Sequence, residues 1–312
     1  MNENKFKYCQ VNPEECSKEE LEKEIERLTH DMNDYNNLQL AYKIFLNSVY
    51  GATGNQYFVA YNPDVAESVT LQGQNLIKFA KKMIEKYFHE QWHKDTELHK
   101  QLGIENVCPI LENSPLVTYC DTDSNYVTFE PVINSCNYKG SPQDFILKIY
   151  EVFLKDWFEE IHQKYAEKFN TENLQNFELE TISNSGLWIG KKKYILNATW
   201  EEPGIEYKDL TNIKYKGIEI VQSSTPPFAR IKLKDMIKYI FEKGNNIKMK
   251  NVTQIMKKWK DEYKLENIEN ISMLRGISDY EKFVLNDRQY LSLKKGCPIH
   301  VRAAAIYNYI LN

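Results

Sequence analysis

Two closely spaced carboxylates are the strongest chemical signal in the sequence. Asp121 and Asp123 lie within the run YCDTDS at residues 119–124. The flanking residues are β-rich, which predicts a hairpin with both aspartates at its tip, where side chains at i and i+2 on extended backbone point to the same side. Carboxylate pairs of this kind suit hard cations such as Mg²⁺, and two such ions can activate an attacking oxygen and stabilise a leaving one. Taken alone, the run is also typical of a polar turn, because aspartate favours turns.

A second group of polar residues, upstream, has the spacing of one helical face. Lys43, Asn47 and Tyr50 follow i, i+4, i+7 in the segment KIFLNSVYG over 43–51. A lysine, an amide and a phenol hydroxyl in one stripe could hold a triphosphate and a base. The alternative interpretation is a helix with a polar edge that ends at a glycine cap, Gly51.

In this order, the two segments resemble the family B DNA polymerases, in which a K-x₃-N-S-x-Y-G fingers helix precedes a Y-x-D-T-D-S palm hairpin. Three further segments extend the resemblance: KKKY at 191–194, IEIVQSSTP at 218–226, and CPIHVRAAA at 297–305 followed by Tyr307 and Asn308. The last two resemble the palm-to-thumb junction and a late thumb segment of T-even-like phage polymerases. Five ordered matches span nearly the whole chain, and agreement of all five by chance is hard to credit.

The resemblance implies a DNA-directed DNA polymerase, a nucleotidyltransferase in which the primer 3′-hydroxyl attacks the α-phosphate of a dNTP. Catalysis would rest on positioning and on two Mg²⁺ ions that stabilise negative charge. By its place in the motif, Asp123 would bind both metals, with Asp121 beside it and Glu180 as a third acidic residue near the ions. Lys43 and Asn47 would grip the incoming triphosphate.

Other matched positions are implied to contact the substrate base pair and the DNA. Tyr50 and Gly51 would pack near the nascent base pair. The residues implied to bind primer-template DNA, together with the thumb lysines, are Lys191, Lys192, Tyr194, Ser223, Ser224, Thr225, Arg230 and Arg302. Contacts with duplex phosphates are sensitive to salt and carry no sequence information.

Local patterns predict the elements that must hold these residues. A capping box at Ser17 predicts an amphipathic helix, and a second helical pattern runs from about Tyr35 to Gly51. Asn62-Pro63 predicts the start of a long helix, and a polar loop is expected over roughly 94–114.

The rest of the chain indicates the fold class. Ser141-Pro142 opens a further helix, residues 177–222 are β-rich, and the pattern is helical after Thr225-Pro226. With the resemblance, this predicts an α+β fold: a polymerase palm, with a mixed sheet and packed helices, that carries partial helical fingers and a mainly helical thumb. The expected domains are fingers over 1–50, palm over 51–222 and thumb over 223–312.

Some parts of the family pattern are not found in the sequence. They are a D-x₂-S-L-Y-P-S palm strand upstream of the fingers and the proofreading exonuclease motifs. We therefore expect a split polymerase, in which an N-terminal polymerase/exonuclease polypeptide provides the missing aspartate and this chain alone is incomplete. A truncated piece of a longer gene would give the same pattern. A sliding clamp is a further partner in the family, and its binding tail is not visible in this sequence.

Two other functions compete with this interpretation. The run HEQWH at 89–93 matches the H-E-x-x-H pattern of zinc metallopeptidases, although a polar helix end gives the same residues. The chain could also be a catalytically inactive DNA-binding or assembly subunit. The intact pair Asp121 and Asp123 argues against that, because a site without catalysis has no need of two adjacent carboxylates.

The amino-acid composition narrows the classes of protein to which this chain could belong. Among 312 residues, 40 Lys+Arg and 44 Asp+Glu give a formal charge of 40 − 44 = −4, so the chain is not the basic module typical of dedicated DNA binding. The six cysteines form no C-x-x-C pair, which favours free thiols and a cytosolic protein. No apolar run approaches the ~20 residues that span a membrane. The expected location is the cytoplasm of a bacterial host, for a phage-encoded protein.

Overall fold

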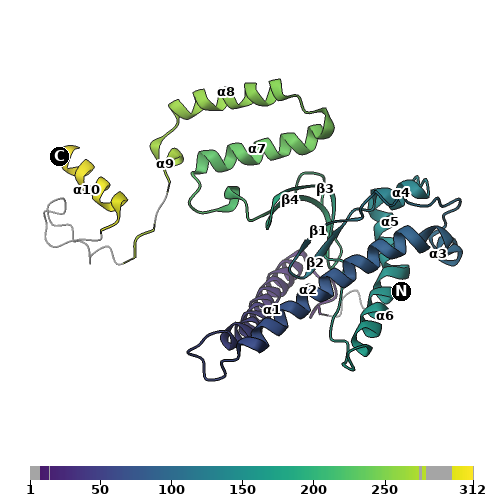
Figure 1. Ribbon diagram of the computed structural model, residues 1–312. Coiled ribbons are helices and arrows are strands. Elements are labelled where there is room, and N and C mark those ends of the chain that lie inside the picture. The colour runs from purple at the N-terminus through teal and green to yellow at the C-terminus, as the bar shows by residue number, and fades with distance from the viewer. Residues whose placement is uncertain (1–7, 14, 274–275, 279–296, 312) are drawn as a thin grey trace. The chain divides into compact units, whose positions relative to one another are not determined.

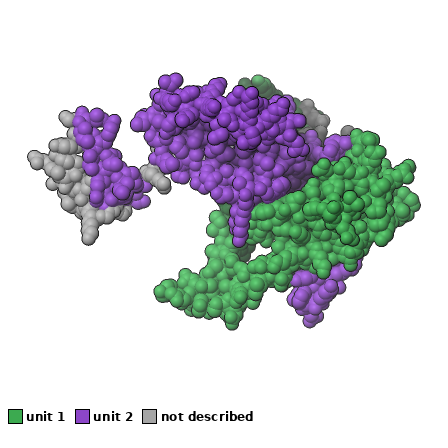
Figure 2. Space-filling view, turned by 45° about the horizontal axis from the view of Figure 1, so that its top comes forward, with its two compact units in different colours: residues 1–139 green, residues 140–312 purple. Residues whose placement is uncertain are grey.

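The computed structural model describes residues 8–13, 15–273, 276–278 and 297–311. Helices and antiparallel strands both contribute to the fold, which confirms the predicted α+β class. The chain divides into two compact units, residues 1–139 and 140–312 (Figure 2). The fingers, palm and thumb boundaries stay a prediction.

The first unit begins with one long helix, α1, over Lys18–Thr53 (Figure 1). Its capping box forms as predicted, because the Glu20 N–H donates to Ser17 Oγ at 3.4 Å and the Ser17 N–H donates to Glu20 Oε2 at 2.9 Å. The two predicted helical stretches are a single helix of 36 residues, and its end at Thr53 corrects the predicted end at Gly51. The helix is continuous because residues 18–50 hold no glycine or proline that would interrupt it. The isolated Gly51 near its end is tolerated within a helix.

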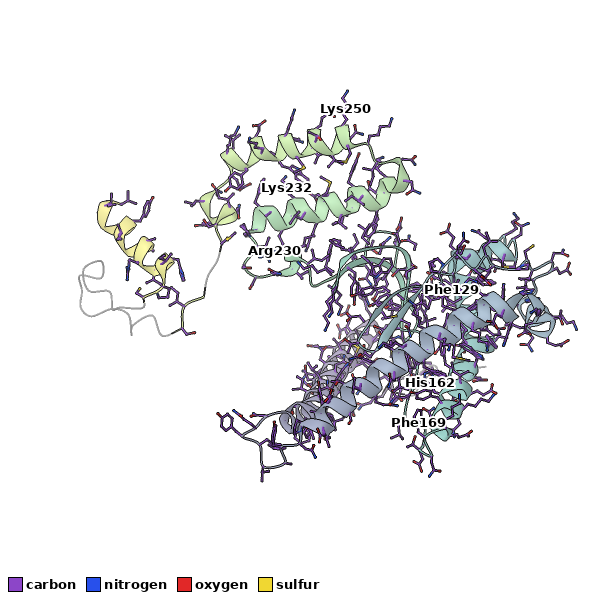
Figure 3. All side chains as sticks on the ribbon, viewed as in Figure 1. Phe129, His162, Phe169, Arg230, Lys232 and Lys250 are labelled. Carbon is purple, nitrogen blue, oxygen red and sulfur yellow. The ribbon has the colours of Figure 1, made fainter. Side chains whose placement is uncertain are left out.

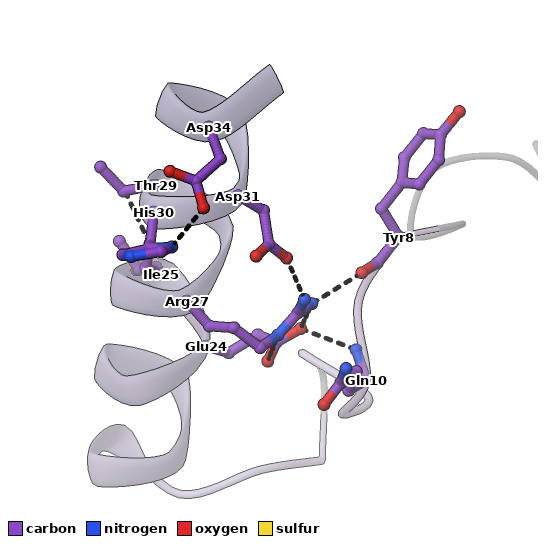
Figure 4. A network of polar contacts seen from close by, with 9 residues as sticks. All are labelled: Tyr8, Gln10, Glu24, Ile25, Arg27, Thr29, His30, Asp31 and Asp34. Atoms are coloured by element: carbon purple, nitrogen blue, oxygen red, sulfur yellow. Dashed lines mark hydrogen bonds and ion pairs between the residues drawn. The ribbon is translucent and has the colours of Figure 1, made fainter. Parts of the chain in front are cut away.

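A buried ion pair ties the N-terminal segment to α1 (Figure 4). Glu24 is 6% exposed and accepts a hydrogen bond from the Gln10 N–H at 2.7 Å. Arg27 donates from Nε to Glu24 Oε2 at 2.9 Å and from Nη2 to the Tyr8 carbonyl at 2.9 Å. The Arg27 guanidinium, helped by the Gln10 amide, lowers the pKa of Glu24 from 4.5 to about 2.

We expect this attachment to weaken in acid. Because the folded pKa of Glu24 lies below its unfolded value, the carboxylate stabilises the native arrangement above pH 4.5, and that contribution is lost as the pH falls toward about 2. In an NMR titration, the Gln10 amide resonance should move with a midpoint well below 4.5, and Glu24→Gln should remove the transition. A midpoint at or above 4.5 would contradict the role given to Arg27.

The second helix and several short elements complete the first unit. Helix α2 covers Pro63–Lys86 and begins at the predicted cap, where the Val65 N–H donates to Asn62 Oδ1 at 3.2 Å. The elements that follow are η1 (a π-helix, Tyr87–Gln91), η2 (a 3₁₀ turn, Trp92–Lys94), α3 (Thr96–Leu102), β1 (Val117–Asp121), β2 (Ser124–Val127) and α4 (Glu130–Ser135).

The core of the first unit gathers around Trp92. Its side chain is fully buried, and its Nε1 donates to Ser135 Oγ at 2.8 Å. Phe88 packs beside it with ring centroids 5.8 Å apart, and the buried His99 ring of α3 lies 5.0 Å away. Helix α3 corrects the polar loop predicted over 94–114, because a short helix with mostly polar residues gives little periodic signal.

The second unit opens with helices. They are α5 (Pro142–Ile149), η3 (a π-helix, Tyr150–Leu154) and α6 (Lys155–Glu167). The predicted start of α5 is confirmed, since the Asp144 N–H donates to Ser141 Oγ at 3.5 Å. His162, on α6, is 1% exposed and stacks on Phe177 with ring centroids 4.6 Å apart; Figure 3 labels this histidine. Burial lowers the pKa of His162, so the ring is held as the neutral form.

A four-stranded antiparallel sheet follows these helices. Its strands are β3 (Thr181–Gly190), β4 (Lys193–Glu201), β5 (Ile205–Glu206) and β6 (Ile213–Lys216). Strand β4 pairs with each of the other three strands. All four lie within the β-rich region predicted over 177–222, but a turn at residues 191–192 divides one continuous β-rich run into β3 and β4.

The chain becomes helical after Pro226, as predicted. The remaining elements are η4 (a 3₁₀ turn, Glu219–Val221), α7 (Pro227–Lys243), η5 (a 3₁₀ turn, Gly244–Asn246), α8 (Met249–Leu265), α9 (Ile268–Ile271) and α10 (Ile299–Leu311). Ile237 of α7 packs with Ile195 of β4 and Ile220 of η4 in an apolar cluster. Among the described helices, none is long and apolar enough to cross a membrane.

Candidate active site

The aspartate run folds as a tight hairpin. Asp121 pairs with Ser124, so Thr122 and Asp123 alone form the turn. The Asp121 carbonyl accepts hydrogen bonds from the Asp123 N–H at 2.6 Å and from Ser124 Oγ at 3.1 Å. The predicted hairpin is confirmed. The expected extended backbone through both aspartates is wrong, because Asp123 lies in the turn itself.

Thr122 has a backbone conformation that its side chain disfavours. Its φ is +51°, in the left-handed region, where a β-branched residue is strained. Two-residue hairpin turns usually place Asn or Gly in this region. A turn that only reversed the chain would be more stable with one of those residues, and strained positions cluster at functional sites. The threonine therefore favours a functional hairpin.

The hairpin tip offers oxygen ligands of the kind that Mg²⁺ prefers. Asp123 is exposed and Asp121 is half-buried, with the Thr122 hydroxyl donating to Asp121 Oδ1 at 3.2 Å. Protein sites for Mg²⁺ use one or two carboxylates and several waters, so this donor set fits the ion. Within the described ranges, no group of three or more His, Cys, Asp or Glu side chains is placed to hold a metal. The hairpin therefore contributes two carboxylates and no third acidic ligand.

The residues predicted to bind the nucleotide lie together on α1. Lys43, Asn47 and Tyr50 are all exposed, and the helix confirms that their spacing gives a shared face. Gly51 continues the helix, with no atom within 4 Å of a Cβ built there. Lys43 is the only charged residue in 35–63, so an anion that approaches this surface would meet a single cation.

The KKKY segment over residues 191–194 has exposed lysines at its start and a buried tyrosine at its end. Lys191 and Lys192 form the turn between β3 and β4, and both are exposed. Tyr194 is 7% exposed and pairs with Trp188 on β3. The two lysines can reach a phosphate backbone from the surface, whereas Tyr194 has little surface to offer. Contact of Tyr194 with DNA stays a prediction.

The predicted junction residues hold the start of α7. Ser223 is exposed, and Ser224 and Thr225 are half-buried. Arg230 is also half-buried, and its Nη2 donates to the Thr225 carbonyl at 3.0 Å, so part of its hydrogen-bonding capacity serves the fold. Arg302 is exposed on α10. DNA binding by all five residues stays a prediction.

Basic residues continue along α7 and α8 (Figure 3). Lys232 is paired with Glu262 at 2.7 Å and lies 5.3 Å from the centroid of the Phe228 ring. Lys250 is exposed at the start of α8. The exposed lysines can attract phosphates, while Lys232 already has an intramolecular partner.

The third acidic residue of the prediction, Glu180, is exposed and directly precedes β3. Its carbonyl accepts a hydrogen bond from the Glu202 N–H at 3.1 Å. Glu180 belongs to the second unit and the two hairpin aspartates to the first. Its role near the metals stays a prediction.

The H-E-x-x-H run does not form a zinc site in this structure. His89 Nε2 lies 3.1 Å from Glu85 Oε2, and its Nδ1 lies 3.5 Å from the Ile110 carbonyl. His89 falls in the π-helix η1 and His93 in the 3₁₀ turn η2, so the two rings are not one turn apart on a regular helix. Sequence reasoning missed Glu85, which also accepts hydrogen bonds from the Leu116 and Val117 amides, more than 30 positions away.

Known proteins that resemble this chain share its site-bearing segment. Residues 15–138 match the model of DNA polymerase family B, and this range holds both α1 and the aspartate hairpin. The chain is 27% identical to the DNA-directed DNA polymerase of Enterobacteria phage T4 over 286 residues, which cover 87% of this chain and 29% of the relative. The segment that holds the candidate site is therefore similar to DNA polymerase family B.

Other relatives extend the comparison. This chain is also 25% identical to the DNA-directed DNA polymerase of Escherichia phage RB69 over 284 residues, or 86% of this chain and 28% of the relative. It is 30% identical to the DNA polymerase delta catalytic subunit of Caenorhabditis elegans over 133 residues, or 42% of this chain and 11% of the relative. The chain thus spans less than a third of the length of the phage relatives.

Proposed function

We propose that this chain is part of the catalytic core of a family B DNA-directed DNA polymerase. The observation that carries the proposal is that one family-matched segment, 15–138, holds both the hairpin with Asp121 and Asp123 and the helix with Lys43. The names of the phage T4 and phage RB69 relatives support the same activity. The substrates are a dNTP and a primer annealed to template DNA.

In the proposed reaction, the primer 3′-oxygen bonds to the α-phosphorus of the dNTP. The bond from that phosphorus to its bridging oxygen breaks, pyrophosphate leaves, and the primer hydroxyl gives up its proton. Two Mg²⁺ ions, when bound, stabilise the negative charge on the attacking and leaving oxygens. Asp121 and Asp123 would hold these ions, with Glu180 as a further acidic residue. The same carboxylates would set where the reacting groups meet, which is the larger part of catalysis in phosphoryl transfer.

The other predicted residues would bind and orient the substrates. The Lys43 ammonium would neutralise triphosphate oxygens, and Asn47 would donate a hydrogen bond to them. Tyr50 would pack against the new base pair. Lys191 and Lys192 would contact phosphates of the primer-template, together with lysines of α7 and α8.

We also propose that further polypeptide covers the second half of α1 when the enzyme works. Large apolar side chains are exposed along this part of the helix, and Leu38, Phe45 and Leu46 are 50%, 64% and 67% exposed. Large exposed apolar patches mark interaction sites. The covering polypeptide would also contribute the missing carboxylate to the metal site.

Primer extension in the presence of Mg²⁺ tests the proposed function. Extension by this chain alone, lost in an Asp123 variant, would place a complete site within the chain and remove the need for a second carboxylate donor. Salt-sensitive binding of primer-template without extension would support a site that another polypeptide completes. Duplex binding that never leads to extension, even with such a polypeptide added, would favour the inactive DNA-binding subunit instead.

We expect Lys43→Ala to reduce use of the nucleotide. Loss of one charge-assisted contact with the triphosphate should lower kcat/KM for dNTP by about 10- to 100-fold, because such contacts contribute roughly 1.5–3 kcal/mol. Lys23→Ala, at an exposed position on the same helix, is the matched control. Steady-state extension at varied dNTP measures both variants, and an unchanged kcat/KM in Lys43→Ala would exclude this role.

A further inference from the structure

The Glu85 carboxylate holds the start of the strand that leads to the aspartates. Its Oε1 accepts hydrogen bonds from the Val117 N–H at 2.8 Å and the Leu116 N–H at 3.1 Å, and its Oε2 lies 3.2 Å from the same Leu116 nitrogen. Leu116 is 0% exposed and Val117 is 3% exposed. Buried amides need a partner within the protein, and this side chain is that partner for both.

His89 holds the carboxylate in turn. Its Nε2 lies 3.1 Å from Glu85 Oε2, and its other ring nitrogen faces the Ile110 carbonyl at 3.5 Å. The two side chains are only 13% and 23% exposed, for His89 and Glu85 respectively. Hydrogen bonds to a carboxylate are strong in such a sheltered place. The histidine that the sequence offers as a zinc ligand thus orients Glu85.

The hairpin is short, so contacts at its base help to fix its position. Its strands are 5 and 4 residues long, and an isolated two-stranded hairpin of this size is marginally stable. The pairing is irregular between Val117 and Tyr119, directly beyond the amides that Glu85 holds. The Leu116 carbonyl accepts a hydrogen bond from the Thr128 N–H at 2.7 Å. The two ends of the hairpin are therefore joined at Leu116, whose amide the Glu85 carboxylate binds.

We propose that Glu85 is a positioning residue for nucleotidyl transfer, with His89 as its orienting partner. The carboxylate ties the Leu116 amide and the first amide of β1, that of Val117, to α2 and thereby sets where Asp121 and Asp123 lie. This inference rests on the proposed polymerase function, since it assigns a task to the base of the same hairpin. If the inference is right, loss of the Glu85 carboxylate displaces Asp121 and Asp123 but removes no group that binds substrate.

Hydrogen–deuterium exchange tests the contact itself. In Glu85→Ala, the Leu116 and Val117 amides should exchange about 10- to 100-fold faster, because they lose a charged acceptor. Glu85→Gln keeps one acceptor oxygen and should give an intermediate rate. Glu90→Ala, at an exposed position on the π-helix that holds His89, is the matched control and should leave the rates unchanged. Unchanged exchange in Glu85→Ala would overturn the inference whatever the activity.

Primer extension tests the consequence. Glu85→Ala should lower kcat by about 100-fold with KM for dNTP nearly unchanged, since small displacements of reacting groups cost that much. Glu85→Gln should restore most of the rate, and His89→Ala should cause a smaller loss. A general loss of folding would instead lower the amount of active enzyme in Glu85→Ala and Glu85→Gln alike. A normal kcat in Glu85→Ala would overturn the inference.

A separate measurement distinguishes failure of this inference from failure of the proposed function. If another polypeptide completes the site, the wild-type chain alone does not extend primers, and the effect of Glu85 on kcat is then not measurable in this chain. The positioning role is then read from Mn²⁺ bound at the hairpin, through paramagnetic broadening of the Thr122 and Asp123 amide resonances. Glu85→Ala should weaken this binding by about 10-fold relative to wild type and to Glu90→Ala. Equal Mn²⁺ affinity in the three proteins would overturn the positioning role.

Discussion

Asp123→Asn should lower kcat for primer extension by more than about 1000-fold in any preparation of this chain that extends primers. Metal ions contribute several kcal/mol of charge stabilisation to such reactions, and each 1.36 kcal/mol is tenfold in rate. The amide keeps the size of the side chain and its tolerance of turns, but it has lost the negative charge that holds a cation. Binding of primer-template should change little, because it depends on lysines elsewhere.

The control is a second aspartate-to-asparagine change at an exposed position without a metal role. Asp156, in the first turn of α6, is exposed and meets that requirement. Single-turnover extension by Asp156→Asn should match that of the wild type. Extension at a normal rate in Asp123→Asn would remove the hairpin from the catalytic mechanism, and with it the main support for the proposed function.

Gly217→Ala should cause the largest loss of stability. Gly217 has a φ of +63°, and a Cβ built there would collide with the Lys192 carbonyl oxygen. Lys192 itself has a φ of +59°, so the turn has no easy way to move aside. Left-handed strain in a non-glycine residue contributes about 1–3 kcal/mol and the collision adds to it, so the free energy of unfolding should fall by at least about 3 kcal/mol. Urea denaturation measures this change.

A second glycine at the same turn provides the matched control. Gly190 ends β3, and a Cβ built there would meet no atom within 4 Å. Gly190→Ala should therefore change the free energy of unfolding by less than about 1 kcal/mol. If the proposed role of Lys191 and Lys192 is right, Gly217→Ala should also weaken salt-sensitive binding of primer-template at temperatures where the protein stays folded. Equal stability of the two variants would mean that the turn rearranges at no cost.

Features set by neighbouring residues were predictable from the sequence. The hairpin around Asp121 follows from two β-rich runs on either side of a polar turn, and the start of α2 follows from Asn62 before a proline. The shared face of Lys43 and Asn47 needs only helical periodicity. The turn at residues 191–192 was not predicted, although Gly190 directly precedes it, because an isolated glycine within a β-rich run also indicates a bulge.

Local sequence patterns do not predict contacts between residues that are far apart in the chain. Glu85 and Leu116 are separated by 31 positions, and no pattern in either segment indicates that the two are in contact. The burial of Tyr194 depends on packing within a sheet, which hydrophobic alternation indicates only in part. A usable signal for Glu85 was its place beside Ile84 and Phe88, since an acidic residue next to buried apolar positions on a helix needs a specific partner.

Because α1 exposes an apolar surface, we expect the behaviour of this chain in solution to depend on the protein concentration. Over residues 35–63, one lysine is the only charge that opposes self-association. Chains that meet through such a surface gain stability by mass action, so their apparent melting temperature rises with concentration while the free surface disappears. We therefore expect α1 to stay open to a partner in dilute samples and to be covered by other copies of the same chain in concentrated ones. Binding and extension measured at two concentrations would separate these two populations.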